Sequence, residues 1–220
     1  MKKQYFTKEN LEFKAREMLE EVKKYRKYHR IEFLPDESAL LIIDMQKYFL
    51  ETTSHAYIPS AEVILPGVEK LISIYSKKSL PVIFTLHSNT EENAGMLGKW
   101  WPDLLGEGTV ESYLPEELES YGGIRIEKHQ YDAFYETNLE EILRGKNISQ
   151  LIICGVMTNV CCETTARSAF VRGFEVFFCV DGTATYSEEH HISTLMNLSY
   201  GFAIPVLLDE LFFVLSRNED

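Results

Sequence analysis

Apolar residues gather in short continuous runs, and the segments between these runs repeat apolar and charged residues at helical spacing. The run at residues 39–43 is partly β-branched and does not alternate with polar residues, which is typical of a central parallel strand covered on both faces. In all, strands are predicted over residues 39–43, 81–86, 123–127, 151–154, 175–180 and 205–208. The helical spacing predicts helices over residues 7–28, 65–78, 139–144, 159–172 and 188–200.

Strands that alternate with helices in this way predict a three-layer α/β/α sandwich. Its sheet should be mostly parallel and doubly wound, with about six strands. The 220 residues suit a single domain. The first helix precedes the first strand, so residues 1 to about 31 form an N-terminal helical extension. Residues 88–122 are the longest irregular region and a candidate lid.

Composition narrows the classes of partner. The chain has 22 Lys and Arg against 34 Asp and Glu, a net charge of −12, and a surface of this sign repels nucleic acid and anionic membranes. A basic cluster is interpreted as a solvated helix face, with nucleic-acid binding as the alternative; it comprises Lys23, Lys24, Arg26, Lys27 and Arg30. The start of the chain lacks the apolar core of a signal peptide, and no apolar run approaches the length of a membrane helix. With four cysteines that form no CxxC pair, we expect a cytoplasmic protein without disulfides.

Four residues whose side chains suit catalysis or ligand binding lie at or just beyond the ends of predicted strands. They are Asp44, His87, Lys128 and Cys161. In parallel sheets ligands bind beyond the carboxyl ends of the strands, so this coincidence indicates a functional site. Each residue also has a simpler interpretation. Asp44 can cap the next turn, and Lys128 can be an ordinary exposed lysine.

Cys161 follows the strand 151–154 in the first turn of a predicted helix. There the unpaired N–H groups and the helix dipole favour a thiolate, so Cys161 is a candidate nucleophile. The alternative is a core cysteine. Cys162 is expected in the core, because adjacent helical residues do not face each other. A carboxylate can take the thiol proton and an ammonium can hold both groups in register, so Asp44, Lys128 and Cys161 form a chemically sensible set.

Three motifs support this set: D-x-Q-x-x-F, a lysine followed by aromatic-x-A-F, and G-V-x-T-x-x-C followed by T-A-x-x-A. Their residues are Asp44, Gln46, Phe49, Lys128, Tyr131, Ala133, Phe134, Gly155, Val156, Thr158, Cys161, Thr165, Ala166 and Ala169. From about residue 38 to 206 the chain resembles the isochorismatase-like cysteine hydrolase superfamily. Its members include nicotinamidases, N-carbamoylsarcosine amidohydrolase and ureide or biuret hydrolases.

The resemblance implies a catalytic triad of Asp44, Lys128 and Cys161. It also implies a cis peptide bond between Val156 and Met157, with the amides of Met157 and Cys161 forming an oxyanion hole. In the implied reaction Asp44 deprotonates Cys161, the thiolate attacks an amide-type carbonyl, an amine leaves, and water hydrolyses the thioester. The family also suggests a homo-oligomer. Aromatic residues near the C-terminus, Phe212 and Phe213, agree with this, although they can equally pack on the sheet.

Departures from two branches of the family narrow the substrate. Isochorismatases cleave a vinyl ether by acid catalysis and typically lack the cysteine, which is present here. Nicotinamidases typically hold a metal with an Asp-x-His pair and another histidine, but residues 51–57 contain no Asp-x-His and His87 has no evident partner. We therefore expect a hydrolase without metal or cofactor that acts on a small amide, carbamoyl or ureido compound. The alternatives are vinyl-ether hydrolysis with Asp44 as the acid, and a binding protein without turnover.

The substrate pocket is expected to have apolar walls with few polar groups. Its candidate residues are Phe49, His87, Trp100, Trp101, Tyr131 and Phe134. The two tryptophans can equally pack a lid against the domain, and His87 can donate to substrate or cap its strand. His190 and His191 lie near the start of a helix, where a structural hydrogen bond is expected.

Overall fold

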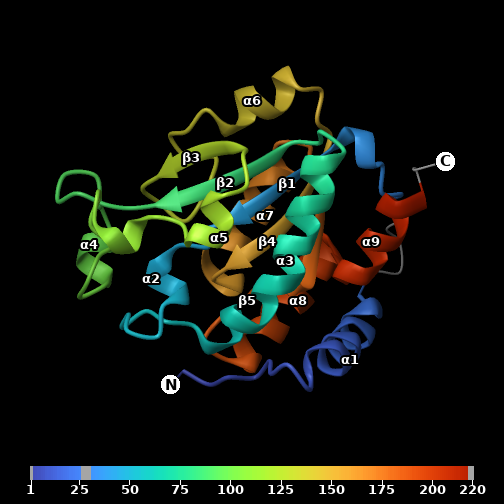
Figure 1. Ribbon diagram of the computed structural model, residues 1–220, viewed down its shortest axis with the longest axis horizontal. Coiled ribbons are helices and arrows are strands. Elements are labelled where there is room, and N and C mark those ends of the chain that lie inside the picture. Colours follow the sequence, from blue (N-terminus) through green and yellow to red (C-terminus); the bar gives the residue numbers. More distant parts are fainter. Residues whose placement is uncertain (1, 26–30, 218–220) are drawn as a thin grey trace.

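The computed structural model describes residues 2–25 and 31–217 of the chain. These residues contain a sheet of six parallel strands in the order β3-β2-β1-β4-β5-β6 (Figure 1). The strands are β1 Ser38–Ile43, β2 Val82–His87, β3 Ile124–Lys128, β4 Gln150–Val156, β5 Glu175–Ala184 and β6 Ile204–Val206. Every residue of β1 and β4 is buried, because helices cover both faces of the sheet.

Helices connect these strands. The longer helices are α1 Leu11–Lys23, α3 Pro59–Lys77, α6 Leu139–Gly145, α7 Glu163–Val171, α8 Glu188–Gly201 and α9 Leu208–Ser216. Three short helices are α2 Lys47–Leu50, α4 Leu97–Trp100 and α5 Glu116–Glu119. The chain moves one way along the sheet from β1 to β3 and the other way from β4 to β6. Right-handed connections therefore place α3 on one face and α7 and α8 on the other, as Figure 1 shows. The predicted three-layer fold is confirmed.

Element ends differ from the sequence prediction in several places; the helix predicted over residues 65–78, for example, is α3 and begins at Pro59. Strand β5 does not end near Asp181 but continues to Ala184, because its register against β4 shifts between Ile153 and Gly155. The predicted strand 205–208 is wrong at its end, since Leu208 begins helix α9. The predicted helix 7–28 is α1 over a shorter span, and its residues 26–28 lie outside the described part of the chain. The same holds for Arg26, Lys27 and Arg30 of the basic cluster.

The two central strands approach closely at the edge where the candidate residues gather. Gly155 near the end of β4 has φ of +124°, and a Cβ atom there would lie 2.1 Å from the carbonyl oxygen of Ile43. Only glycine fits this contact. The close approach joins the end of β1, which leads into Asp44, to the end of β4, which leads into the turn of Cys161.

The N-terminal segment before α1 packs on the same core as the rest of the chain. The Lys3 amide donates to the carbonyl of Tyr186 at 2.9 Å, and the amides of Tyr5 and Phe6 donate to Ser60 Oγ. Phe6 is fully buried, and α1 packs against α8. None of the described helices is long and apolar enough to cross a membrane.

Candidate active site

The structure brings Asp44, Lys128 and Cys161 together at the carboxyl edge of the sheet, from three separate segments. The Lys128 ammonium lies 2.8 Å from Asp44 Oδ2 and 3.6 Å from Cys161 Sγ. Both members of the ion pair are fully buried, and 6% of Cys161 is exposed. Lys128 is therefore the link between the acid and the thiol.

Asp44 is held by the neighbouring strand β2. The Thr85 hydroxyl donates to Asp44 Oδ1 at 2.6 Å and accepts the Asp44 amide at 3.1 Å. Asp44 itself has φ of +49°, which turns the chain sharply after β1. Its carboxylate contacts Thr85 and Lys128, so the alternative role of capping the next turn does not describe it. Thr85 is a site residue that the sequence did not predict.

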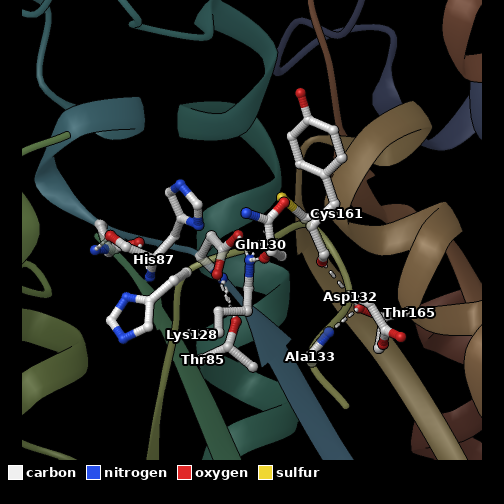
Figure 2. Close-up of polar contacts among 12 residues, drawn as sticks. Thr85, His87, Lys128, Gln130, Asp132, Ala133, Cys161 and Thr165 are labelled. Atoms are coloured by element: carbon white, nitrogen blue, oxygen red, sulfur yellow. Dashed lines mark hydrogen bonds and ion pairs between the residues drawn. The ribbon is translucent and has the colours of Figure 1, made fainter. Parts of the chain in front are cut away.

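Lys128 has three partners for its ammonium. Besides Asp44 and Cys161, Nζ donates to the carbonyl oxygen of Gln130 at 2.9 Å (Figure 2). Burial alone would lower the pKa of Lys128, but the negative charges of Asp44 and the Cys161 thiolate form outweigh it, so the pKa is raised. Lys128 is accordingly a fixed cation and not the exposed lysine of the alternative interpretation.

Cys161 lies in a π-helical turn, Thr158–Cys162, that leads into α7. The preceding peptide bond between Val156 and Met157 is cis, as expected. The expectation that this position favours a thiolate is wrong for the resting site. Burial raises the pKa of the Cys161 thiol above its usual value; Lys128 opposes this and Asp44 reinforces it. Burial thus favours the protonated thiol and opposes the effect predicted for the helix start.

A pocket of about 190 Å³ opens above Cys161. Its lining residues are Tyr48, Phe49, His55, Ala56, His87, Leu97, Trp101, Pro102, Asp103, Leu104, Leu105, Tyr131, Met157, Val160, Cys161 and Tyr186. Four of the six predicted wall residues are among them. The Trp101 indole donates to the Tyr131 hydroxyl at 2.6 Å, which joins the irregular region 88–122 to the segment after β3.

Two predicted wall residues do not line this pocket. The Trp100 side chain is 72% exposed, and Phe134 is buried with its ring stacked on Phe174 at 5.8 Å. The physical reason for Trp100 is that it ends α4, whereas Trp101 follows in extended conformation, so the two rings diverge. The prediction also missed four residues that line the pocket, namely Tyr48, His55, Asp103 and Tyr186.

The remaining candidate residues, His190, His191 and Cys162, do not line the pocket. His191 is fully buried, and its Nδ1 lies 2.8 Å from the Tyr5 hydroxyl and 3.2 Å from Thr158 Oγ1. This is the structural hydrogen bond expected for the histidine pair, while His190 is exposed. Cys162 is fully buried, as predicted. Among the described residues, no group of three or more His, Cys, Asp or Glu side chains has the arrangement of a metal site.

A thiol, a buried ammonium and a buried carboxylate beside an apolar pocket are the groups that covalent catalysis by cysteine requires. The sequence profile described as the isochorismatase domain matches residues 38–210. The chain therefore belongs to the isochorismatase family.

Two kinds of relative agree with this membership. Nicotinamidase 3 from Arabidopsis thaliana is 43% identical over 179 residues, covering 79% of this chain and 86% of the relative. The structure of a cysteine hydrolase from Pseudomonas syringae pv. phaseolicola 1448A superposes with a TM-score of 0.80 at 25% identity, over 86% of this chain and 96% of that one. N-carbamoylsarcosine amidase from Thermoplasma acidophilum gives a TM-score of 0.70 at 25% identity, over 79% and 97%.

Proposed function

We propose that the protein is a metal-independent cysteine amidohydrolase. The observation that carries this proposal is the contact of the Cys161 thiol with the buried Lys128–Asp44 pair at the base of the pocket. The relatives support the reaction class, since they include a nicotinamidase and an N-carbamoylsarcosine amidase.

The geometry supports a thioester mechanism. Asp44 takes the thiol proton when substrate excludes water from the pocket, and Lys128 holds the resulting thiolate. The thiolate attacks the substrate carbonyl, and the proton passes to the leaving amine. Water then hydrolyses the thioester with Asp44 as the base.

Backbone amides supply the oxyanion hole of this proposal. The amides of Val160 and Cys162 both donate to the Met157 carbonyl, at 3.1 and 3.2 Å. The Cys161 amide between them, together with the Met157 amide, is the candidate donor pair for the developing oxyanion. Removing one such donor typically costs about 10²–10³ in kcat.

The pocket favours a small planar amide. Its walls are largely aromatic, and about 190 Å³ suits a molecule of one ring with a carboxamide. Nicotinamide is the first substrate to test, because the Arabidopsis relative is named for it. The pyridine ring would lie among side chains such as Phe49, Trp101 and Tyr186.

The test is ammonia release from nicotinamide, a carbamoyl amino acid and a ureide in buffer with a chelator. We expect release by the wild type, none by Cys161→Ala, and near-normal release by Cys162→Ala, the adjacent buried thiol. Activity that persists in Cys161→Ala would refute the cysteine mechanism. Turnover of isochorismate by that variant would favour acid catalysis of vinyl-ether cleavage by Asp44. Loss of release with the chelator would refute metal independence.

We also propose a cytoplasmic homo-oligomer. All four cysteines are free and buried, which suits a reducing compartment. Phe213 is 57% exposed, whereas Phe212 is partly buried beneath the ammonium of Lys70 at 4.1 Å, so the two aromatics divide between an outer surface and the core. Light scattering of the purified chain tests the oligomer, and a monomeric mass at micromolar concentration would contradict it.

A further inference from the structure

His87 is fixed in place at the end of β2. It pairs in register with Lys128 on β3, and its ring lines the pocket. The Gln46 side chain accepts the His87 amide at 2.9 Å and donates to the His87 carbonyl at 2.8 Å. A second donation from Gln46 to the Ser112 carbonyl, at 2.6 Å, ties this clamp to the irregular region. The backbone of His87 is therefore held from both sides beside the triad.

Asn89 lies two residues after His87, and hydrogen bonds to neighbouring groups fix the orientation of its side-chain amide. Its Nδ2 donates to the carbonyl of His129 at 3.0 Å and to Asn93 Oδ1 at 3.3 Å. Asn93 Oδ1 also accepts the Thr90 amide at 2.7 Å, which identifies that atom as the oxygen. Because both acceptors require the NH₂ group of Asn89, its Oδ1 points the other way.

This orientation makes Asn89 Oδ1 a candidate acceptor for the His87 ring. His87 Nδ1 and Asn89 Oδ1 are both buried without a hydrogen bond of good geometry among the described residues. The Asn89 side chain lies close enough to the His87 ring to raise its pKa, which is the effect of a hydrogen-bond acceptor. Burial lowers the pKa of His87 to about 4, and the Lys128 charge adds to this effect, so the ring is neutral at pH 7. A neutral imidazole that donates from Nδ1 has a bare lone pair on Nε2.

We propose that Asn89 holds His87 as the Nδ1–H tautomer, and that His87 Nε2 accepts a hydrogen bond from an N–H group of the substrate. The inference rests on the proposed amidohydrolase activity and adds to it a basis for substrate selection. An amide or ureido group carries N–H donors next to the reacting carbonyl, whereas an ester of the same acid carries none. The site therefore selects amides over esters.

Tyrosine hydroxyls and a second histidine of the pocket walls are engaged by the protein. The Tyr186 hydroxyl donates to the Ala56 carbonyl at 2.9 Å, and the Tyr48 hydroxyl pairs with His55 Nε2 at 2.9 Å. His87 is thus the wall residue beside Lys128 whose ring nitrogen is available to a ligand. A site built to accept an N–H group rejects an analogue without it more strongly than an apolar site does.

The tautomer is measured without substrate by long-range ¹H–¹⁵N NMR of protein labelled in its six histidines. His87→Gln assigns the His87 signals by their loss. We expect a protonated Nδ1 and an unprotonated Nε2 at pH 7. A protonated Nε2, or an imidazolium ring, overturns the proposal. Asn89→Leu should remove the preference of His87 for the Nδ1–H tautomer and give a mixture of the two tautomers.

Selection is measured as kcat/KM for nicotinamide against methyl nicotinate. In His87→Leu the amide should lose about 10–100-fold relative to the ester, whereas His87→Gln, which keeps an acceptor oxygen, should recover most of that loss. Equal losses for amide and ester would mean that His87 only packs the wall. If the wild type hydrolyses neither compound, the choice of nicotinamide as substrate is in error. The preference of the site for the amide over the ester is then measured as the degree to which each compound protects Cys161 from alkylation by iodoacetamide. Equal protection by both compounds overturns the inference.

Discussion

Replacing Asp44 by Asn should make Cys161 more reactive toward an alkylating agent while abolishing turnover. In the wild type, Asp44 raises the pKa of the Cys161 thiol. The negative charge of Asp44, 2.8 Å from the Lys128 ammonium, also offsets part of the stabilisation that Lys128 gives to the thiolate. Asparagine removes the negative charge at nearly constant volume. Lys128 then acts on the thiolate, whose sulfur lies 3.6 Å from the ammonium.

The size of the effect follows from the charge removed. Two unit charges about 4 Å apart interact by about 4 kcal/mol at an effective dielectric constant of about 20, which corresponds to about 3 pKa units. The dipole of asparagine and added water reduce this to about 2 units, or about 100-fold more thiolate near neutral pH. A thiolate of lower pKa is also a weaker nucleophile, by about tenfold at a Brønsted slope of about 0.5. The net increase in alkylation rate is therefore about tenfold.

The assay is the rate of carbamidomethylation of Cys161 by iodoacetamide, followed by mass spectrometry between pH 6 and 10. The wild-type rate should still rise above pH 9, and the Asp44→Asn profile should be displaced to lower pH. Glu127→Gln is the matched control, because Glu127 precedes Lys128 on β3 but is exposed. An Asp44→Asn rate at pH 7 equal to or below that of the wild type would refute the electrostatic account.

Three further outcomes concern stability. Lys128→Met should lower the free energy of unfolding by about 3–5 kcal/mol, because the buried carboxylate of Asp44 loses its cation; in urea titrations the double variant with Asp44→Asn should lose less. Tyr5→Phe should cost about 2 kcal/mol by the same measurement, since buried partners of the hydroxyl are left unpaired, while Tyr200→Phe at an exposed position should cost nothing. His191 has its pKa lowered to about 3 by burial, so between about pH 6.5 and pH 3 the unfolded state binds one more proton than the folded state, and the free energy of unfolding decreases as the pH is lowered. Between pH 6 and 4, unfolding free energies of His191→Gln should show a pH slope smaller by about 1.4 kcal/mol per unit, and an unchanged slope would contradict the burial argument.

The sheet and the triad could be predicted from sequence for one physical reason. Parallel strands buried on both faces are continuous apolar runs, and a polar residue directly after such a run must lie at the edge of the sheet. Asp44 satisfies this rule. Lys128 follows a segment that alternates apolar and polar residues, and it reaches the same edge because β3 is parallel to the other strands and ends there. The ends of β5 and β6 do not follow, because a register shift and a helix start depend on contacts with other elements.

The details of the site are less visible in the sequence. Thr85 is a common strand residue inside an apolar run, and nothing local distinguishes a threonine that bonds a carboxylate from one that fills a sheet. Trp100 and Trp101 are adjacent, yet only Trp101 lines the pocket, because a four-residue helix ends between them. The protonation state of Cys161 depends on its burial, which the position at a helix start does not reveal.

The N-terminal segment has a practical consequence for work with this protein. The Lys2 ammonium contacts the carbonyl of His55 and lies 4.7 Å from the ring centre of Tyr186, and both of these residues line the pocket. An affinity tag fused ahead of Lys2 therefore starts beside the substrate cavity and changes the charge and bulk at its wall. Reference kinetics for every variant should come from protein in which no tag or scar lies next to Lys2.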